Sequence, residues 1–350
     1  MDDQKSLSEI DKLRQKLQSA TLPANLKERA LEQVDRINLT LKFGGNLAQL
    51  DIVEKYIDWI TTLPWETRTE DSLDVNHAKE ILDGTHFGLD KIKRRILEYL
   101  SVLILQKQNL KAESFHAPSL FFVGLAGTGK TSIVKSIAEA LNRKYVRIPF
   151  GGLSSALDLR GQSKTSPESE PGMIIKALRR TGSRNPIILL DELDRITPES
   201  RASIMGVLLE ILDPKQNMNF TDYFVDYPFD LSQVLFIATA NNTNNISTAV
   251  LDRLEIIQMP SYNDDEKITI GKNFLVPQYL KDAGLTPQHL IIDDTVWPQI
   301  VRPLGFDSGV RSLERAVEGM VRKAAYKIVQ SGQNQSFKIT AENLRDFIAS

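Results

Sequence analysis

The sequence predicts an α/β fold with a parallel sheet, preceded by a helical N-terminal arm and followed by a helical C-terminal lid. Three observations carry this prediction. A glycine-spaced turn joins an apolar strand at 120–123 to a helix. Further apolar runs at 186–190 and 234–240 alternate with helical segments, which is typical of a parallel sheet covered on both faces. Toward both ends of the chain, apolar residues recur at three- and four-residue intervals, which indicates helices.

Length and composition limit the possible classes of protein. A chain of 350 residues is too long for one core, and we expect an arm at 1–72, an α/β domain at 73–258 and a lid at 259–350. The 43 basic and 45 acidic residues give no electrostatic reason to expect nucleic acid or a membrane as partner. The chain has no cysteine, so disulfides and thiol chemistry are excluded. Without a secretory signal or a membrane-spanning apolar run, a cytoplasmic protein is expected.

The N-terminal third reads as helices with short breaks. A turn at 21–25 separates the first two helices, and a third helix ends near two tryptophans, Trp59 and Trp65. These rings could form a partner surface, but a packed helix corner is the better interpretation. The polar segment 66–74 is predicted to be a linker. Helices are then expected at Val75–Leu82 and Leu89–Leu110.

The turn after the first predicted strand has the spacing of a phosphate-binding loop. Gly124 is followed, four residues later, by Gly129, Lys130 and Thr131, at the start of a helix. In such a loop backbone N–H groups and the helix N-terminus bind phosphate, while the lysine reaches the β- and γ-phosphates and the threonine hydroxyl holds Mg²⁺. The predicted nucleotide-binding residues are Gly124, Leu125, Ala126, Gly127, Thr128, Gly129, Lys130 and Thr131.

Two later strands end in polar residues suited to nucleotide hydrolysis. Asp191 follows the apolar run at 186–190 and is predicted to bind Mg²⁺, and Glu192 is predicted to polarise the attacking water. Asn241 follows the run at 234–240 and could bridge that water and the γ-phosphate. Ligands in parallel sheets bind at the carboxyl ends of strands, where these residues lie. His86 could line a base pocket, although a helix-end histidine is equally compatible with the sequence.

Taken in order, these motifs resemble an AAA+ ATPase, and the longer stretches resemble one family, the Lon proteases. The resemblance covers essentially the whole chain. The stretches that carry it most strongly are Tyr56–Trp65, Glu80–Asp83, Phe87–Leu89, Leu208–Pro214, Phe229–Ser232, Phe236–Asn241, Leu251–Arg253 and Gly309–Arg311.

The resemblance implies further roles and partners. It implies ATP or ADP with Mg²⁺ as cofactors and a ring of identical subunits, usually six. Arg253 matches the arginine that reaches a neighbouring subunit's nucleotide, and Arg311 matches the nucleotide-sensing arginine of the lid. The segment His86, Phe87 and Gly88 occupies the adenine-contacting position.

The chain departs from the family pattern in two places. The family's peptidase domain, with its serine–lysine dyad, would follow Ser350, so we expect an ATPase without peptidase activity, either a fragment or a naturally protease-less relative. The family's substrate-gripping loop has an aromatic and an aliphatic residue where this chain has Ser166 and Pro167, which predicts weakened handling of unfolded protein substrates. A protease-less remodeller and an ATP-gated scaffold with slow hydrolysis remain alternatives.

Overall fold

The computed structural model describes residues 2–42, 48–108, 118–302, 309–331 and 336–348. The chain divides into two compact units, each discontinuous in sequence. The first contains 1–73, 106–121 and 141–256, and the second contains 74–105, 122–140 and 257–350. The domain boundaries expected at 72 and 258 stay a prediction.

A five-stranded sheet confirms the predicted α/β class. Its strand order is β2-β3-β6-β1-β7, and the pairs β2–β3 and β3–β6 are parallel. All residues of β3 and β6 are buried, as expected for a sheet covered on both faces. The prediction missed β7. The strands are β1 (Ser119–Val123), β2 (Tyr145–Pro149), β3 (Ile187–Asp191), β6 (Leu235–Ala240) and β7 (Leu254–Gln258).

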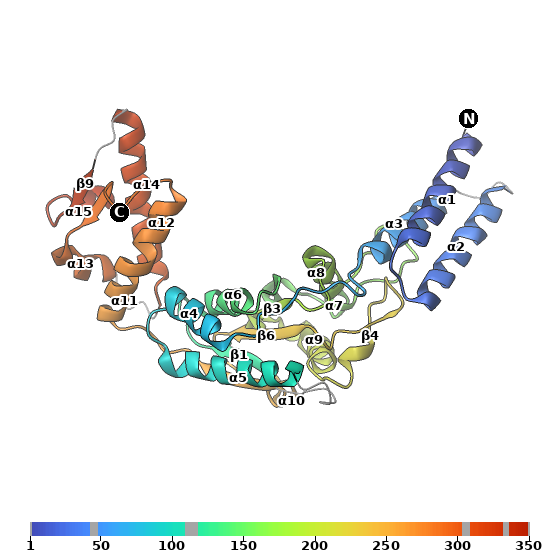
Figure 1. Ribbon diagram of the computed structural model, residues 1–350, viewed down its shortest axis with the longest axis horizontal. Helices are drawn as coiled ribbons and strands as arrows, with labels where there is room; N and C mark the ends of the chain where they lie inside the picture. The colour runs from blue at the N-terminus through green and yellow to red at the C-terminus, as the bar shows by residue number, and fades with distance from the viewer. Residues whose placement is uncertain (1, 43–47, 109–117, 303–308, 332–335, 349–350) are drawn as a thin grey trace. The chain divides into compact units, whose positions relative to one another are not determined.

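The arm belongs to the first unit and consists of three helices, in which α1 packs against α2 and α3 (Figure 1). Trp65 donates its indole N–H to the Ile60 carbonyl at 2.8 Å and packs on Phe229, and Trp59 packs on Phe224. The packed helix corner is therefore confirmed. The arm helices are α1 (Asp2–Ser19), α2 (Ala24–Lys42) and α3 (Ala48–Thr62). The unit's remaining α-helices and short strands are α7 (Leu157–Arg160), α8 (Met173–Thr181), α9 (Pro198–Ile211), α10 (Thr248–Leu251), β4 (Phe220–Thr221) and β5 (Pro228–Phe229), and it also has 3-10 helices at Phe150–Gly152, Leu193–Arg195 and Asn217–Asn219.

The second unit contains the helix after the glycine loop together with the predicted lid. The lid has its own core around Trp297, Val317 and Phe347, and the parallel strand pair β8–β9 belongs to it. The predicted end of a helix at Leu110 lies outside the described residues. The unit's elements are α4 (Val75–Thr85), α5 (Asp90–Gln108), α6 (Lys130–Ala140), α11 (Asp264–Ile270), a π-helix (Gly271–Leu275), α12 (Val276–Asp282), β8 (Leu290–Ile292), α13 (Trp297–Val301), α14 (Arg311–Ser331), β9 (Phe337–Ile339) and α15 (Leu344–Phe347).

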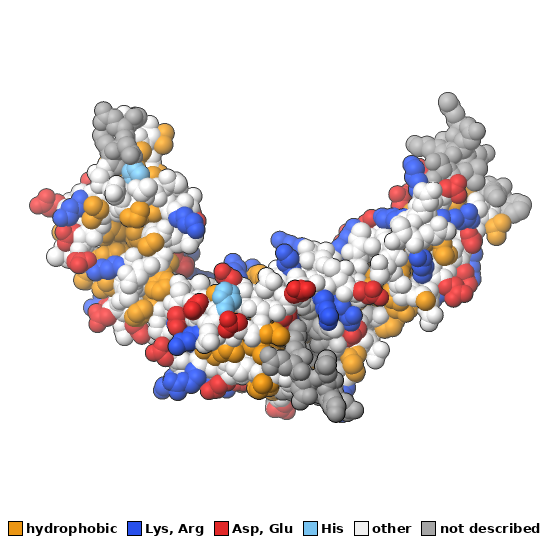
Figure 2. Space-filling view, viewed as in Figure 1, with side chains coloured by type: hydrophobic (Ala, Val, Ile, Leu, Met, Phe, Trp, Pro, Cys, Tyr) orange, Lys and Arg blue, Asp and Glu red, His pale blue; other side chains and the backbone are white. Residues whose placement is uncertain are grey.

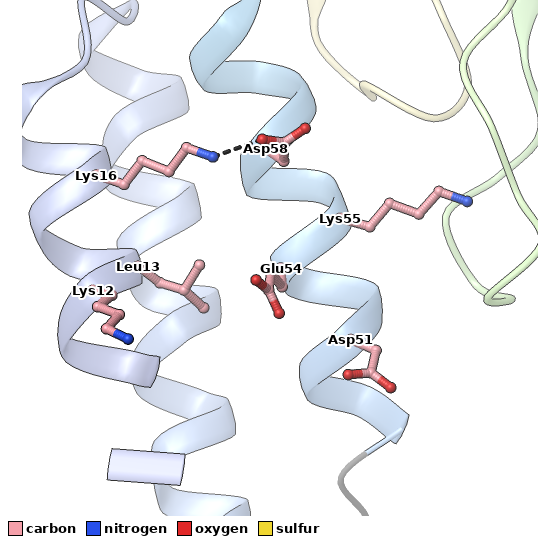
Figure 3. Close-up of a pocket in the computed structure, with 7 residues that line it drawn as sticks. All are labelled: Lys12, Leu13, Lys16, Asp51, Glu54, Lys55 and Asp58. Carbon is pink, nitrogen blue, oxygen red and sulfur yellow. Dashed lines mark hydrogen bonds and ion pairs between the residues drawn. The ribbon is translucent and has the colours of Figure 1, made fainter. Parts of the chain in front are cut away.

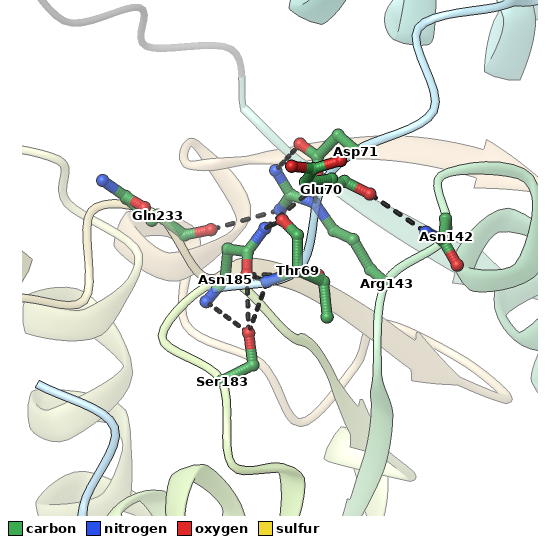
Figure 4. Close-up of polar contacts among 8 residues, drawn as sticks. All are labelled: Thr69, Glu70, Asp71, Asn142, Arg143, Ser183, Asn185 and Gln233. Atoms are coloured by element: carbon green, nitrogen blue, oxygen red, sulfur yellow. Dashed lines mark hydrogen bonds and ion pairs between the residues drawn. The ribbon is translucent and has the colours of Figure 1, made fainter. Parts of the chain in front are cut away.

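The segment predicted to be a linker is fixed by hydrogen bonds (Figure 4). Asp71 forms a buried ion pair with Arg143, with Arg Nη2 2.7 Å from Asp Oδ2. Asn185 accepts the backbone N–H of Thr69 at 2.9 Å and donates to the Thr69 carbonyl. Segment 66–74 has no helix before Val75, as predicted, but side chains from elsewhere in the chain hold it in place.

Basic and acidic side chains are interspersed over the visible face of the described residues (Figure 2). This distribution agrees with the formal net charge of −2. Of the helices that are described, none is both long and apolar enough to cross a membrane.

Candidate functional site

The phosphate loop connects the buried strand β1 directly to α6, which begins at Lys130. Gly127 and Gly129 have φ angles of +80° and +90°, a region that residues with a Cβ rarely occupy. A Cβ at Gly124 would lie 2.6 Å from the Met259 carbonyl oxygen. The glycine spacing is thus required by backbone conformation and by close packing, as a phosphate-binding loop demands.

Two side chains of the loop bond to its own backbone. Lys130 Nζ donates to the carbonyl oxygens of Gly124 at 2.6 Å and Leu125 at 2.9 Å. The buried hydroxyl of Thr128 also donates to the Leu125 carbonyl. These bonds hold the ammonium group at the turn. Thr131 follows as the second residue of α6, in the first helical turn.

Arg311 lies against the phosphate loop, and its nucleotide-sensing role stays a prediction. The Val310 N–H donates to the Gly127 carbonyl at 3.1 Å, and a Cβ at Gly127 would lie 3.1 Å from Arg311 Cγ. Gly309 has no room for a Cβ, which would approach the Ala126 carbonyl oxygen to 2.5 Å. Arg311 is also the first residue of α14. The segment that contains it is therefore closely packed on the loop.

His86 lies beside Gly129 of the loop, and both of its ring nitrogens form hydrogen bonds with side-chain hydroxyl groups. Nε2 is 2.9 Å from the Ser132 hydroxyl and Nδ1 is 2.9 Å from the Thr85 hydroxyl. Burial, and secondarily the charge of Lys93, lowers the pKa of His86 to about 4, so the ring is neutral at pH 7. These contacts support the helix-end interpretation of its side chain. The adenine contact predicted for His86, Phe87 and Gly88 stays a prediction.

Tyr262 is a residue of this loop environment that the sequence analysis missed. Its hydroxyl donates to the Thr128 carbonyl at 3.4 Å and would lie 3.7 Å from a Cβ at Gly129. Burial raises the pKa of Tyr262 to about 12. Tyr262 follows the end of β7 by four residues, so its position near the loop could have been predicted only if β7 had been predicted as a strand.

Asp191 ends β3 as predicted, and two unpredicted side chains hold its carboxylate. Arg147 Nε on the neighbouring strand β2 pairs with Oδ2, and the buried Thr239 hydroxyl on β6 donates to Oδ1. Hydrogen bonding to Asp191 raises the pKa of Arg147 above its usual value. The alternation of side chains along β2 could have indicated Arg147, but the partner strand could not be known.

Glu192 has an unusual backbone conformation for a residue other than glycine, with φ +62° and ψ +48°. Its N–H donates to the Thr239 hydroxyl at 3.2 Å, and its carboxylate lies 3.4 Å from Arg195 Nη1. Strained residues of this kind concentrate at functional sites, because surrounding contacts must compensate the cost. This conformation is compatible with the role predicted for Glu192.

Asn241 follows β6 directly and donates from Nδ2 to Asp194 Oδ2 at 3.3 Å. Asn242 donates to the same oxygen at 3.4 Å, and Asn245 donates to the Asp194 backbone carbonyl. Asp194 thus fixes the turn that presents Asn241. Asp194 was not predicted as part of the site, because acids near strand ends usually face solvent.

Arg253 is bonded within its own chain. Nη2 lies 3.2 Å from Asp213 Oδ2, and Nη1 donates to the Ala249 carbonyl at 2.9 Å. Its side chain is one-third exposed. The role toward a neighbouring subunit stays a prediction.

The loop that matches the family's substrate-gripping loop is anchored at both its base and its tip. The buried carboxylate of Asp222 accepts the N–H of Gly172 at 2.7 Å. Lys55 of α3 donates to the Pro167 carbonyl at 3.0 Å, and Lys164 Nζ lies 4.0 Å from the centre of the Tyr56 ring. Lys55 also lines the charged pocket between α1 and α3, together with Lys16 and Asp58 (Figure 3).

Comparison with known proteins agrees with this geometry. Residues 120–262 match the family described as ATPase family associated with various cellular activities (AAA), and residues 281–340 match the Lon protease AAA+ ATPase lid domain. The chain is 40% identical over 346 residues to Lon protease 2 of Thermus thermophilus and 41% identical over 340 residues to Lon protease 1 of Bacillus subtilis. These matches cover 97% of this chain but only 42% and 43% of the two relatives. The chain therefore carries an AAA+ ATPase module of the Lon protease family.

Proposed function

We propose that this chain binds ATP with Mg²⁺ and hydrolyses it to ADP and phosphate, as the ATP-consuming module of a Lon-like machine. The observation that carries the proposal is the phosphate loop, in which two glycines with positive φ lead to the N-terminus of α6, with Lys130 and Arg311 beside them. Asp191 ends β3 and is followed by Glu192, and Asn241 follows β6; these are the carboxyl ends of parallel strands, where ligands bind in such sheets.

The donor set fits a magnesium ion that is shared with the nucleotide. Among the described residues no group of three or more His, Cys, Asp or Glu side chains could hold a metal by itself. Mg²⁺ commonly uses one or two protein ligands together with phosphate oxygens and water, and Asp191 and Thr131 would supply the protein ligands. The ion neutralises phosphate charge when bound.

The residues of the chain have distinct roles in the proposed reaction. Lys130 exchanges its bonds to loop carbonyls for the β- and γ-phosphates, since an ammonium group pairs more strongly with anionic oxygen than with a neutral carbonyl. Glu192 accepts a proton from the attacking water, and Asn241 orients that water. Arg311 stabilises the charge that develops on the phosphates.

Two substitutions test the proposal. Lys130→Ala should abolish measurable binding of a fluorescent ATP analogue, whereas the control Lys135→Ala, exposed on the same helix, should bind normally. Glu192→Gln should keep binding and slow hydrolysis by about 10²- to 10⁴-fold. The matched control Glu139→Gln should keep the parent rate. A Glu192→Gln variant with the parent's rate would remove Glu192 from this role.

We also propose that the module works as a ring in which Arg253 leaves Asp213 and reaches the nucleotide of the next subunit. Specific ATPase activity should then rise with protein concentration, and Arg253→Ala should bind ATP but hydrolyse it poorly. A melting curve controls for misfolding. Parent-like rates from a demonstrated Arg253→Ala monomer would contradict the ring.

A protease-less remodeller is the second candidate, and the exposed Ser166 and Pro167 favour it because they offer little surface to grip a polypeptide. A basal ATPase rate well above the slow hydrolysis of a scaffold would exclude the scaffold alternative. Because no serine–lysine dyad is recognisable in the sequence, we expect no cleavage of unfolded casein by this chain. Cleavage that responds to serine-directed inhibitors would overturn that expectation.

A further inference from the structure

Thr239 is an unusual residue for its position in the sheet. It is fully buried in β6, where the other residues are leucine, phenylalanine, isoleucine and alanine. A buried hydroxyl is unfavourable unless it is hydrogen-bonded, and an apolar residue of similar size would pack equally well. The presence of a hydroxyl here therefore needs an explanation in its partners.

Both partners of the Thr239 hydroxyl are at the acidic end of β3. The oxygen donates to Asp191 Oδ1 and accepts the backbone N–H of Glu192 at 3.2 Å. The parallel register, in which Leu190 lies opposite Ala238, brings Thr239 beside these residues. One hydroxyl thus fixes the carboxylate of Asp191 and the backbone of Glu192 at once.

The bond to Glu192 is important because that residue has a φ angle of +62°. A residue with a Cβ is strained in this conformation and keeps it only when neighbouring groups hold it there. Without an acceptor for its N–H, the Glu192 backbone can relax, and the direction of the carboxylate changes with it. Asp191 would keep Arg147 as a partner but would lose its second anchor.

We propose that Thr239 is a positioning residue for ATP hydrolysis, which orients Asp191 and Glu192 without touching the nucleotide. This inference rests on the proposed function. Thr239→Val keeps the shape of the side chain but removes the hydroxyl. We expect kcat to fall about 10- to 100-fold, because a small misplacement of a catalytic group has effects of this size. KM for ATP should change less than about three-fold, since the phosphate loop is unaffected.

Two comparisons separate positioning from a general structural role. Thr239→Ser restores the hydroxyl and should recover kcat to within about three-fold of the parent. In a Glu192→Gln background, Thr239→Val should reduce the residual rate by a smaller factor than in the parent, because one of the two groups that Thr239 orients is already disabled while Asp191 is not. Thr181→Val on α8, whose hydroxyl bonds to the Ala177 carbonyl, is the matched control and should keep the parent's kcat.

The outcomes are distinguishable. A parent-like kcat in Thr239→Val, or the same fractional loss with and without Glu192→Gln, would overturn the inference, as would failure of Thr239→Ser to recover activity. A parent-like Glu192→Gln would instead overturn the proposed function. If Thr239→Val is unfolded and does not bind the fluorescent ATP analogue, Thr239→Ser provides the test. A parent-like kcat of Thr239→Ser at unchanged KM supports the inference. A loss of kcat in Thr239→Ser as large as that in Glu192→Gln contradicts it.

Discussion

The phosphate loop at 124–131 and the loop at 161–172 solve the same packing problem in different ways. Each loop contains a glycine that has no space for a Cβ. A Cβ at Gly124 would lie 2.6 Å from the Met259 carbonyl oxygen, and a Cβ at Gly172 would lie 2.0 Å from the Leu159 carbonyl oxygen. The phosphate loop is closed by its own side chains, through Lys130 and Thr128. The second loop has a bond of its own between the Ser166 and Ser169 hydroxyls, but its base and tip are held by residues distant in sequence.

This difference explains why one loop is a motif and the other is not. Although Val310 and Tyr262 also bond to the phosphate loop, its glycines and the two side chains that bond to its backbone from within lie in eight consecutive residues, so substitution at these positions changes the conformation or the chemistry. In the second loop Asp222 holds the base and Lys55 holds the tip. The side chains of Ser166 and Pro167 are exposed, and their identity can change while the loop keeps its path.

The largest effect should come from filling the glycine positions. Gly172→Ala and Gly124→Ala force backbone contacts that cannot relax by side-chain movement, and each should lower the free energy of unfolding by about 3 kcal/mol or more, measured by urea denaturation. Gly206→Ala in α9, where a Cβ meets nothing within 4 Å, is the control and should stabilise by about 0.5–1 kcal/mol. Equal stability of Gly172→Ala and the parent would show that the base of the second loop is not closely packed.

Removal of the Asp222 carboxylate should have the next largest effect. It accepts the N–H groups of Gly172, Phe224 and Val225, and Asp222→Ala leaves these buried donors unpaired. We expect a loss of about 2–4 kcal/mol in urea denaturation with unchanged ATP binding. Asp226→Asn, which keeps a residue type suited to the φ of +52° at this position, removes ion pairs to Arg29 and the half-buried Lys164 and should cost less than about 1 kcal/mol. Loss of ATP binding by folded Asp222→Ala would show that the two loops are coupled.

The two loop regions should respond to acid with opposite sign. Burial lowers the pKa of His86 to about 4, below its unfolded value of 6.5, so its stabilisation is present above pH 6.5 and is lost toward pH 4. Burial raises the pKa of Asp222 to about 6, above its unfolded value of 3.8, so its contribution is full below pH 3.8 and is lost as the pH rises through 6. Between pH 7 and 5 each change amounts to about 1–2 kcal/mol.

Stability measured at pH 7 and pH 5 checks this prediction. The stability advantage of the parent over His86→Gln should shrink at pH 5, and its advantage over Asp222→Asn should grow. Changes of the same sign in both variants would contradict the assignment.

The smallest effect on stability is expected at the tip of the second loop. Ser166→Tyr with Pro167→Ile should leave the urea midpoint nearly unchanged, because both side chains are exposed. The added aromatic surface should instead raise stimulation of the ATPase by an unfolded protein severalfold. Strong stimulation of the parent, with no increase in the double variant, would show that another segment grips the substrate.

Local patterns in the sequence predicted the elements that depend on local chemistry. The strands at 120–123 and 234–240 were predicted to within one residue of their observed bounds, and the start of the helix after the glycine turn was also predicted, because apolar runs and glycine spacing indicate them directly. The short strands β7 and β8 were missed, since their pairing partners lie far away in sequence. Arg147, Asp194, Thr239 and Tyr262 were missed for the same reason: each acts through a neighbour that only the fold provides.

The anchored segment at 69–71 has a practical consequence for dividing this chain by protein engineering. Asp71 is the carboxylate partner of Arg143, whose side chain is only 9% exposed. A truncated protein that began at residue 73 would lack Asp71, so the buried guanidinium of Arg143 would lose its carboxylate partner. Asn185 would also lose its hydrogen bonds to Thr69. Uncompensated buried charge typically costs several kcal/mol. A soluble nucleotide-binding fragment should therefore begin before Thr69, although the sequence places the more obvious cut after it.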